Sequence, residues 1–195
     1  AMKNDSFRKI VASDDSWIEV TGADGSDHSH SMDTHNVLLG QDGNIGGKTG
    51  TTDDAGYCFT SAYNRDGDEI YTVVLNSTTT DQRFTDTATL ANWYYGHKVT
   101  VAIANTQEKT ANGNPLIARI SQTDWTDKTI DATLADPAAQ ATVFSLAGEV
   151  TEKVSYDDLS GTVHVGDKVG SVTLKQDGTK IAVMDLVADE EGSGP

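Results

Sequence analysis

Residues 45–76 read IGGKTGTTDDAGYCFTSAYNRDGDEIYTVVLN, and this stretch decides the fold of the chain. Residues 55–63 and 70–75 are rich in β-branched and aromatic side chains, and the NRDGD run at 64–68 has the composition of a tight turn. The pattern predicts two antiparallel strands joined as a hairpin. Residues 45–52 form a further strand-like segment, flanked by turns, before that hairpin.

A helix is expected directly after the hairpin. Residues 81–96 place apolar side chains at mixed spacings of three and four, and Gly96 stands where a helix would end. Two strands followed by a helix predict a sheet with the helix laid across one face.

The N-terminal part contains less regular patterns. Residues 4–12 predict a short helix, capped by Asp5 or Ser6, that packs through one apolar face. Residues 21–34 are dense in Gly, Ser, Asp and His, which indicates an exposed loop. Residues 36–40 are expected to form a brief apolar anchor that ends at a glycine.

The composition changes after about residue 104. Short strand-like segments at 115–120, 141–146, 169–174 and 181–187 alternate with turns, and residues 176–179 carry a hairpin signal. These segments predict a second, small all-β domain. We therefore expect one domain over residues 1–100 and another over 101–190, with a frayed acidic tail that begins at Asp189 and includes residues 191–195.

Charge and cysteine content restrict the possible partners. The 195 residues carry 30 acidic and 14 basic side chains, a formal charge of −16, so no basic surface is available to bind nucleic acid. Cys58 is the only cysteine, which excludes an intrachain disulfide and a cysteine-based zinc site. The sequence contains no run of about 18 apolar residues of the kind that crosses a membrane.

The motif with the clearest chemical meaning is Lys48-Thr49-Gly50. A cation and a hydroxyl can hold a carboxylate, and a residue without a side chain lets a substrate backbone approach the edge of a strand. The same three residues also fit a turn-flanked strand with a solvated lysine, so the tripeptide alone does not decide between the two interpretations.

The surroundings of this motif resemble a known family. Residues 36–95, with Lys48-Thr49-Gly50 followed by Ala55-Gly56-Tyr57-Cys58, resemble the low-molecular-mass penicillin-binding DD-carboxypeptidases of peptidase family S11. Residues 7–11 are similar to the helix that precedes this block in the family, and residues 166–170 and 186–188 to the β-domain that follows it. The resemblance implies an α+β chain, with a partial penicillin-recognition (β-lactamase/transpeptidase-like) fold and antiparallel sheet, then a small all-β domain.

The resemblance also implies roles for individual residues. Lys48, Thr49 and Gly50 match the catalytic lysine motif, and the backbone N–H of Thr51 would be one oxyanion donor. A wider substrate-binding set is implied, made of Thr51, Thr52 and Arg83. For Arg83, which falls where the family places an arginine near the substrate carboxylate, an exposed arginine at a helix start is the alternative. No cofactor and no metal are implied.

The nucleophile of the family is not recognisable in the chain. The family places a Ser-x-x-Lys helix and a Ser-x-Asn element upstream of the lysine motif. Ser6-Phe7-Arg8-Lys9 has the first spelling but lies in the segment that resembles a later helix, and no Ser-x-Asn occurs. The chain alone is therefore expected to form no acyl-enzyme, and the abrupt start at Ala1 suggests a missing N-terminal part.

Other candidate sites have simpler explanations. His28, His30 and His35 could suggest a metal site, but a Gly/Ser/Asp-rich loop predicts solvated side chains instead. The Asp53-Asp54 pair and residues 66–68 are typical of turns, where Asp makes local hydrogen bonds.

The function implied for the parent protein is removal of the terminal D-alanine from peptidoglycan stem peptides, with β-lactam antibiotics as inhibitors. This substrate implies a location outside the cytoplasmic membrane, with membrane attachment only through a segment absent here. Two alternatives stay open. One is a β-lactamase-like or esterase relative on the same fold, against which the distal β-domain argues, and the other is a non-catalytic wall-binding or spacer module.

Overall fold

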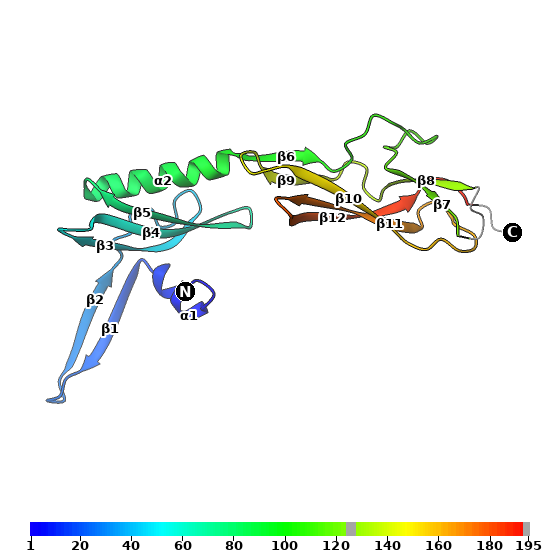
Figure 1. Ribbon diagram of the computed structural model, residues 1–195. Coiled ribbons are helices and arrows are strands. Elements are labelled where there is room, and N and C mark those ends of the chain that lie inside the picture. Colours follow the sequence, from blue (N-terminus) through cyan, green and yellow to red (C-terminus); the bar gives the residue numbers. More distant parts are fainter. Residues whose placement is uncertain (124–127, 193–195) are drawn as a thin grey trace. The chain divides into compact units, whose positions relative to one another are not determined.

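A computed structural model describes residues 1–123 and 128–192 of the chain (Figure 1). The chain divides into two compact units, Ala1–Gly96 and His97–Pro195. No helix among the described residues is long and apolar enough to cross a membrane. The predicted boundary at residue 100 lies four residues after this division, and the long helix of the first unit ends at Gly96.

The first unit contains two helices and two antiparallel sheets. Strands β3, β4 and β5 form one sheet in that order, and β1 pairs with β2 alone. The elements in chain order are α1 Asp5–Val11, β1 Asp15–Thr21, β2 Asp27–Asp33, β3 Asn44–Thr52, β4 Gly56–Arg65, β5 Asp68–Ser77 and α2 Thr80–Gly96.

The predicted hairpin and its helix are confirmed. Asp66 and Gly67 join β4 to β5 with φ angles of 53° and 85°, the two positive values that a type I′ turn requires. Helix α2 lies along one face of the three-stranded sheet (Figure 1). The buried ring of Phe84 meets Phe59 of β4 edge to face, with centroids 5.2 Å apart. This contact fixes which face of the sheet is covered.

The prediction of a loop over residues 21–34 is wrong. Residues 27–33 form β2, which pairs in register with β1 around a turn that starts at Gly22. Every residue of β2 is exposed, so the segment contributes no core, as expected. The polar composition hid the strand because its stability comes from backbone pairing with β1, which carries Trp17, Ile18 and Val20.

Two other details of the N-terminal part differ from the prediction. The cap of α1 is Asn4, whose side-chain oxygen accepts the N–H of Phe7 at 2.9 Å. The anchor before β3 is polar, because Asn36 and Asn44 are buried and hydrogen-bond to each other at 2.9 Å, while Val37 is exposed. The side-chain oxygens of Asn36 and Asn44 also accept the backbone N–H groups of Leu38 and Gly46, so the two amides hold this segment through hydrogen bonds.

The second unit is all-β in its described residues. Its larger sheet has the strand order β10-β11-β12-β8-β7, and β6 pairs with β9. The strands are β6 Lys98–Ala102, β7 Ala118–Ser121, β8 Thr129–Leu134, β9 Gln140–Phe144, β10 Val150–Tyr156, β11 Lys168–Gln176 and β12 Thr179–Ala188. Four of these were expected, and β6, β8 and β10 were not, because they are short or carry charged residues.

One continuous apolar core supports this unit. Its largest fully buried members are Ile130, Leu134, Val169, Val172 and Leu186. The predicted hairpin at residues 176–179 is confirmed, with positive φ at Asp177 and Gly178.

The prediction of a frayed tail from Asp189 is wrong for the residues that the structure describes. Asp189 is buried, and its carboxylate accepts hydrogen bonds from the Thr110 hydroxyl and, at 2.9 Å, from the Asn114 amide. Glu191 contacts His164 at 2.9 Å, and Gly192 pairs with Val163. Residues 193–195 of the predicted tail lie outside the described residues.

Replacing Asp189 by alanine should destabilise the second unit. Thr110 and Asn114 would each lose the carboxylate to which they donate a hydrogen bond. Leaving a buried polar group without its partner costs about 1–3 kcal/mol. We expect the free energy of unfolding measured by denaturant titration to fall by about 2 kcal/mol or more. Glu149→Ala, which removes an exposed acidic side chain from the same unit, is the control and should stay within about 0.5 kcal/mol. Equal losses in the two variants would contradict the proposed anchoring.

Candidate functional site

Strand β3 sorts the motif residues onto two faces of the sheet. Side chains alternate along a strand. Thr49 lies opposite Phe59, on the face covered by α2, and is buried. Lys48 lies opposite Thr60 on the other face and is exposed. Because β3 is the first strand in the order β3-β4-β5, one of its edges pairs with no strand among the described residues.

The glycines of β3 differ in what surrounds them. A Cβ atom on Gly46 would lie 2.7 Å from the carbonyl oxygen of Val11, and one on Gly47 would lie 2.7 Å from that of Thr60. Both glycines are therefore required for packing. A Cβ atom on Gly50 would meet nothing within 4 Å. The interior gives no reason for a glycine at position 50, and the space beside it is open to a ligand.

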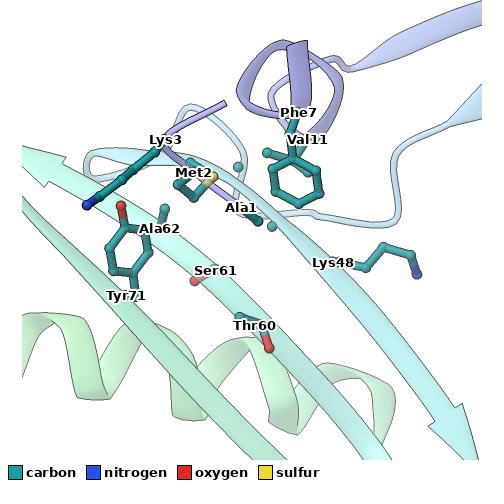
Figure 2. A pocket seen from close by; sticks show the side chains of 12 residues that line it. Ala1, Met2, Lys3, Phe7, Val11, Lys48, Thr60, Ser61, Ala62 and Tyr71 are labelled. Atoms are coloured by element: carbon teal, nitrogen blue, oxygen red, sulfur yellow. The ribbon is translucent and has the colours of Figure 1, made fainter. Parts of the chain in front are cut away.

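Lys48 borders two cavities of the first unit. One has a volume of about 430 Å³ and is lined largely by apolar groups, among them Met2, Phe7 and Val11 (Figure 2). The other, of about 360 Å³, lies between α1, β3 and the base of the β1–β2 hairpin. The lysine stem lines the first cavity, while its ammonium points away from the apolar residues and donates to the carbonyl oxygen of Thr49. The motif lysine thus stands beside a groove.

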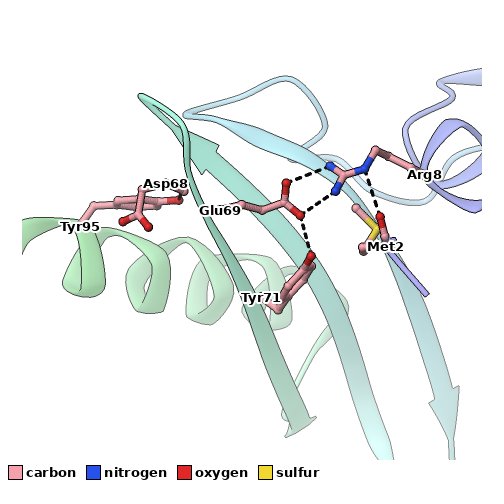
Figure 3. A network of polar contacts seen from close by, with 6 residues as sticks. All are labelled: Met2, Arg8, Asp68, Glu69, Tyr71 and Tyr95. Carbon is pink, nitrogen blue, oxygen red and sulfur yellow. Dashed lines mark hydrogen bonds and ion pairs between the residues drawn. The ribbon is translucent and has the colours of Figure 1, made fainter. Parts of the chain in front are cut away.

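Helix α1 lines both cavities, and an ion pair holds it against the sheet (Figure 3). Arg8 donates two hydrogen bonds of 2.9 Å to the carboxylate of Glu69 on β5, and the Tyr71 hydroxyl donates to the same carboxylate at 2.6 Å. The Arg8 guanidinium, followed by the Tyr71 hydroxyl, lowers the pKa of Glu69 below its ordinary value of 4.5. A bidentate pair of this kind fixes orientation as well as distance.

Arg83 lies on the other side of the sheet, in the first turns of α2, and touches Thr51. Its Nη1 donates to the Thr51 hydroxyl at 3.2 Å. The arginine is only 6% exposed, which excludes the alternative of an exposed arginine at a helix start. Thr51 itself is exposed. The structure therefore brings two of the three predicted substrate-binding residues together, with the hydroxyl in front of the guanidinium.

Thr52, the third member of that set, has a local contact. Its hydroxyl oxygen accepts the backbone N–H of Ala55 at 3.0 Å and so shapes the turn between β3 and β4. Ser6 and Lys9 lie on the surface of α1 and are exposed. No group of three or more His, Cys, Asp and Glu side chains that could hold a metal ion occurs in residues 1–123 and 128–192.

The residue that the sequence did not single out is Tyr57. The Arg83 guanidinium carbon lies 5.9 Å from the centre of its ring and 4.8 Å from that of Phe84. Tyr57 is also the cross-strand neighbour of Thr51. The Ala55-Gly56-Tyr57 run was part of the family resemblance, but only the fold shows that it meets the arginine.

Comparisons with known proteins found solved structures that are similar to this chain. No family model and no curated protein matches the chain. The DD-transpeptidase of a Streptomyces strain is 31% identical over 49% of this chain and 37% of its own, with a TM-score of 0.46. D-alanyl-D-alanine carboxypeptidase DacD from Francisella tularensis is 22% identical over 87% of this chain and 41% of its own, with a TM-score of 0.38.

Both of these solved structures are DD-peptidases by name. The chain spans about two fifths of the length of each.

Alanine substitutions at two glycines of β3 separate packing from function. Gly47→Ala pushes a Cβ atom against the Thr60 carbonyl, and we expect it to cost about 1–3 kcal/mol of unfolding free energy. Gly50→Ala enters open space and should change stability by no more than about 0.5 kcal/mol. Thermal or denaturant unfolding of the first unit measures both. A Gly50→Ala loss as large as that of Gly47→Ala would show that Gly50 serves packing.

The Arg8–Glu69 pair should make the first unit acid-sensitive. Since the folded pKa of Glu69 is lowered, its contribution is fully present above about pH 4.5 and is lost as the pH falls through the lowered value. The wild-type melting temperature should therefore fall more steeply below pH 4.5 than that of Glu69→Gln. Glu19→Gln, at an exposed glutamate of β1, serves as the control and should follow the wild type. Parallel curves for wild type and Glu69→Gln would contradict this linkage.

Proposed function

We propose that the chain is the C-terminal part of a serine-type D-alanyl-D-alanine carboxypeptidase that acts on peptidoglycan stem peptides outside the cytoplasmic membrane. A relation to peptidoglycan-acting penicillin-binding proteins agrees with the DD-peptidases among the similar solved structures. The observation that carries the proposal is the arrangement along β3. An edge strand presents a lysine, a glycine with open space beside it, and a threonine backed by a buried arginine.

This arrangement suits a peptide that ends in a carboxylate. The substrate backbone would lie along the free edge of β3, and Gly50 leaves room for it. Its terminal carboxylate would meet the exposed Thr51 hydroxyl first, with the Arg83 guanidinium supplying positive charge from behind. Such charge acts strongly because burial lowers the local dielectric constant.

Lys48 and the Thr51 backbone would act at the scissile bond. Lys48 would stabilise the negative charge that develops during acyl transfer, and the Thr51 N–H would be one oxyanion donor, a contribution of about 3 kcal/mol. The serine and its base are proposed to come from a segment outside this chain.

The part of the sheet face opposite α2 that α1 leaves exposed supports docking of such a segment. Lys48, Thr60 and Val73 form one cross-strand row on this face, and Tyr71 lies beside it. Tyr71, Val73 and Leu75 of β5 are 57%, 56% and 69% exposed. Covering these side chains would remove apolar surface from water, which stabilises the packed state by about 25 cal/mol per Å² of surface buried. A nucleophile-bearing segment laid on this face would also lie next to the lysine.

A fluorescent penicillin tests the proposal directly. The full product of the gene should be labelled, whereas this chain alone should not be. Lys48→Ala in the full product should lower the acylation rate at least about 100-fold, since one electrostatic contact in such a site is worth 10²–10³ in rate. Lys3→Ala removes an ammonium from the lining of the same cavity and serves as the control, with an expected change under about twofold. An unchanged rate in Lys48→Ala would remove that lysine from the site.

The same protein preparation separates the alternative functions. Release of D-alanine from a D-Ala-D-Ala peptide, with slow turnover of bound penicillin, supports the carboxypeptidase. Rapid hydrolysis of penicillin would favour a β-lactamase-like relative. Absence of both labelling and hydrolysis in the full product would contradict the proposal and favour a wall-binding module.

A further inference from the structure

The guanidinium of Arg83 lies near two aromatic rings, with its carbon 4.8 Å from the centre of the Phe84 ring and 5.9 Å from that of Tyr57. No ion pair to Arg83 occurs among the described residues, and its buried Nε has no hydrogen-bond partner there. The Thr51 hydroxyl is its side-chain hydrogen-bond partner. A buried charge without a counter-charge is costly, and ring faces with their negative quadrupole offset part of that cost.

The two rings have different roles in the fold. Phe84 is the neighbour of Arg83 in the chain and is fixed in the core by its edge-to-face contact with Phe59. Tyr57 comes from β4, is only partly buried, and lies next to Thr51 across the β3–β4 ladder. Tyr57 is therefore the residue that connects the guanidinium to the strand that carries the motif.

The local backbone is built to place Tyr57. Strand β5 has one extra residue between Val74 and Ser77 relative to β4, and Asn76 in this bulge has a φ of 55°. Gly56 packs against it so closely that a Cβ atom would lie 2.5 Å from the Asn76 side-chain oxygen. Ser77 then donates to Asp86 of α2 at 2.8 Å. These contacts tie the start of β4 to the helix that carries Arg83.

We propose that Tyr57 is a positioning residue whose ring holds the Arg83 guanidinium against Thr51, so that the pair discriminates peptides with a free C-terminal carboxylate from amides. This inference rests on the proposed function. The ring face excludes water from one side of the guanidinium and keeps its hydrogen-bonding edge toward the hydroxyl. Without the ring, the cation is free to rotate into the space left behind, and selectivity for the carboxylate falls.

Nuclear magnetic resonance of this chain tests the positioning itself and needs no enzymatic activity. In the wild type, the Nε–H resonance of Arg83 should be shifted upfield by ring currents and should exchange slowly with water, since the group is buried. Tyr57→Leu should reduce that shift and speed the exchange at least about tenfold, while Tyr57→Phe keeps both. Tyr156→Leu, at an exposed tyrosine of the other unit, is the matched control. An unchanged resonance in Tyr57→Leu would overturn the inference.

Kinetics of the full gene product test the consequence. Tyr57→Leu should raise the KM for an acyl-D-Ala-D-Ala peptide about fivefold to tenfold with kcat within about twofold, because a ring contact of this kind aids binding of the carboxylate. The KM for the corresponding C-terminal amide should stay unchanged. Tyr57→Phe should behave like the wild type. A purely structural defect would change both substrates alike, and that outcome would contradict positioning.

Arg83→Ala distinguishes failure of the inference from failure of the proposed function. If Arg83→Ala abolishes the preference for the carboxylate and Tyr57→Leu does not alter it, Tyr57 does not position the arginine and the inference alone fails. If Arg83→Ala itself leaves the preference intact, the carboxylate site of the proposed function is wrong.

Discussion

The alternation of side chains along one edge strand is the constraint on which the candidate site depends. Strand β3 is held in register by β4, and this pairing sends Lys48 to the face opposite α2 and Thr49 to the face that α2 covers. A slip by one residue would exchange the two faces and place a lysine against the aromatic contact of Phe59 and Phe84. Gly46 and Gly47 prevent such a slip because larger side chains would collide with their neighbours.

Arg83, the buried arginine, completes the candidate site, and its place there depends on strand β3. Arg83 can lie between α2 and the sheet with little exposure because Thr51 offers it a hydroxyl and the rings of Phe84 and Tyr57 lie near its guanidinium. A guanidinium that is held in place before a ligand arrives loses less entropy on binding than a mobile one. The same burial explains why the exposed Thr51, and not the arginine, would form the outer surface of the site.

The β4–β5 and β11–β12 hairpins were predictable from the sequence, because Asp66-Gly67 and Asp177-Gly178 are local turn signals that do not depend on tertiary contacts. The position of the lysine motif at a strand edge was expected from its chemistry, because a substrate backbone needs a free edge to approach. The β1–β2 hairpin was not predictable, since its polar strand β2 has no buried face. Arg83 and Tyr57 are 26 positions apart in the sequence, so no local pattern predicts their contact or the burial of Arg83. The roles of Lys48, Thr49, Gly50, Thr51, Thr52 and Arg83 in chemistry stay predictions.

A crystal structure of the full gene product with a bound peptide that ends in D-Ala-D-Ala is the most direct measurement. We expect the peptide backbone to lie along β3 beside Gly50 and its terminal carboxylate to accept a hydrogen bond from Thr51, with Arg83 behind it. A peptide bound elsewhere, with the edge of β3 covered by another part of the protein, would show that β3 is not the substrate-binding strand.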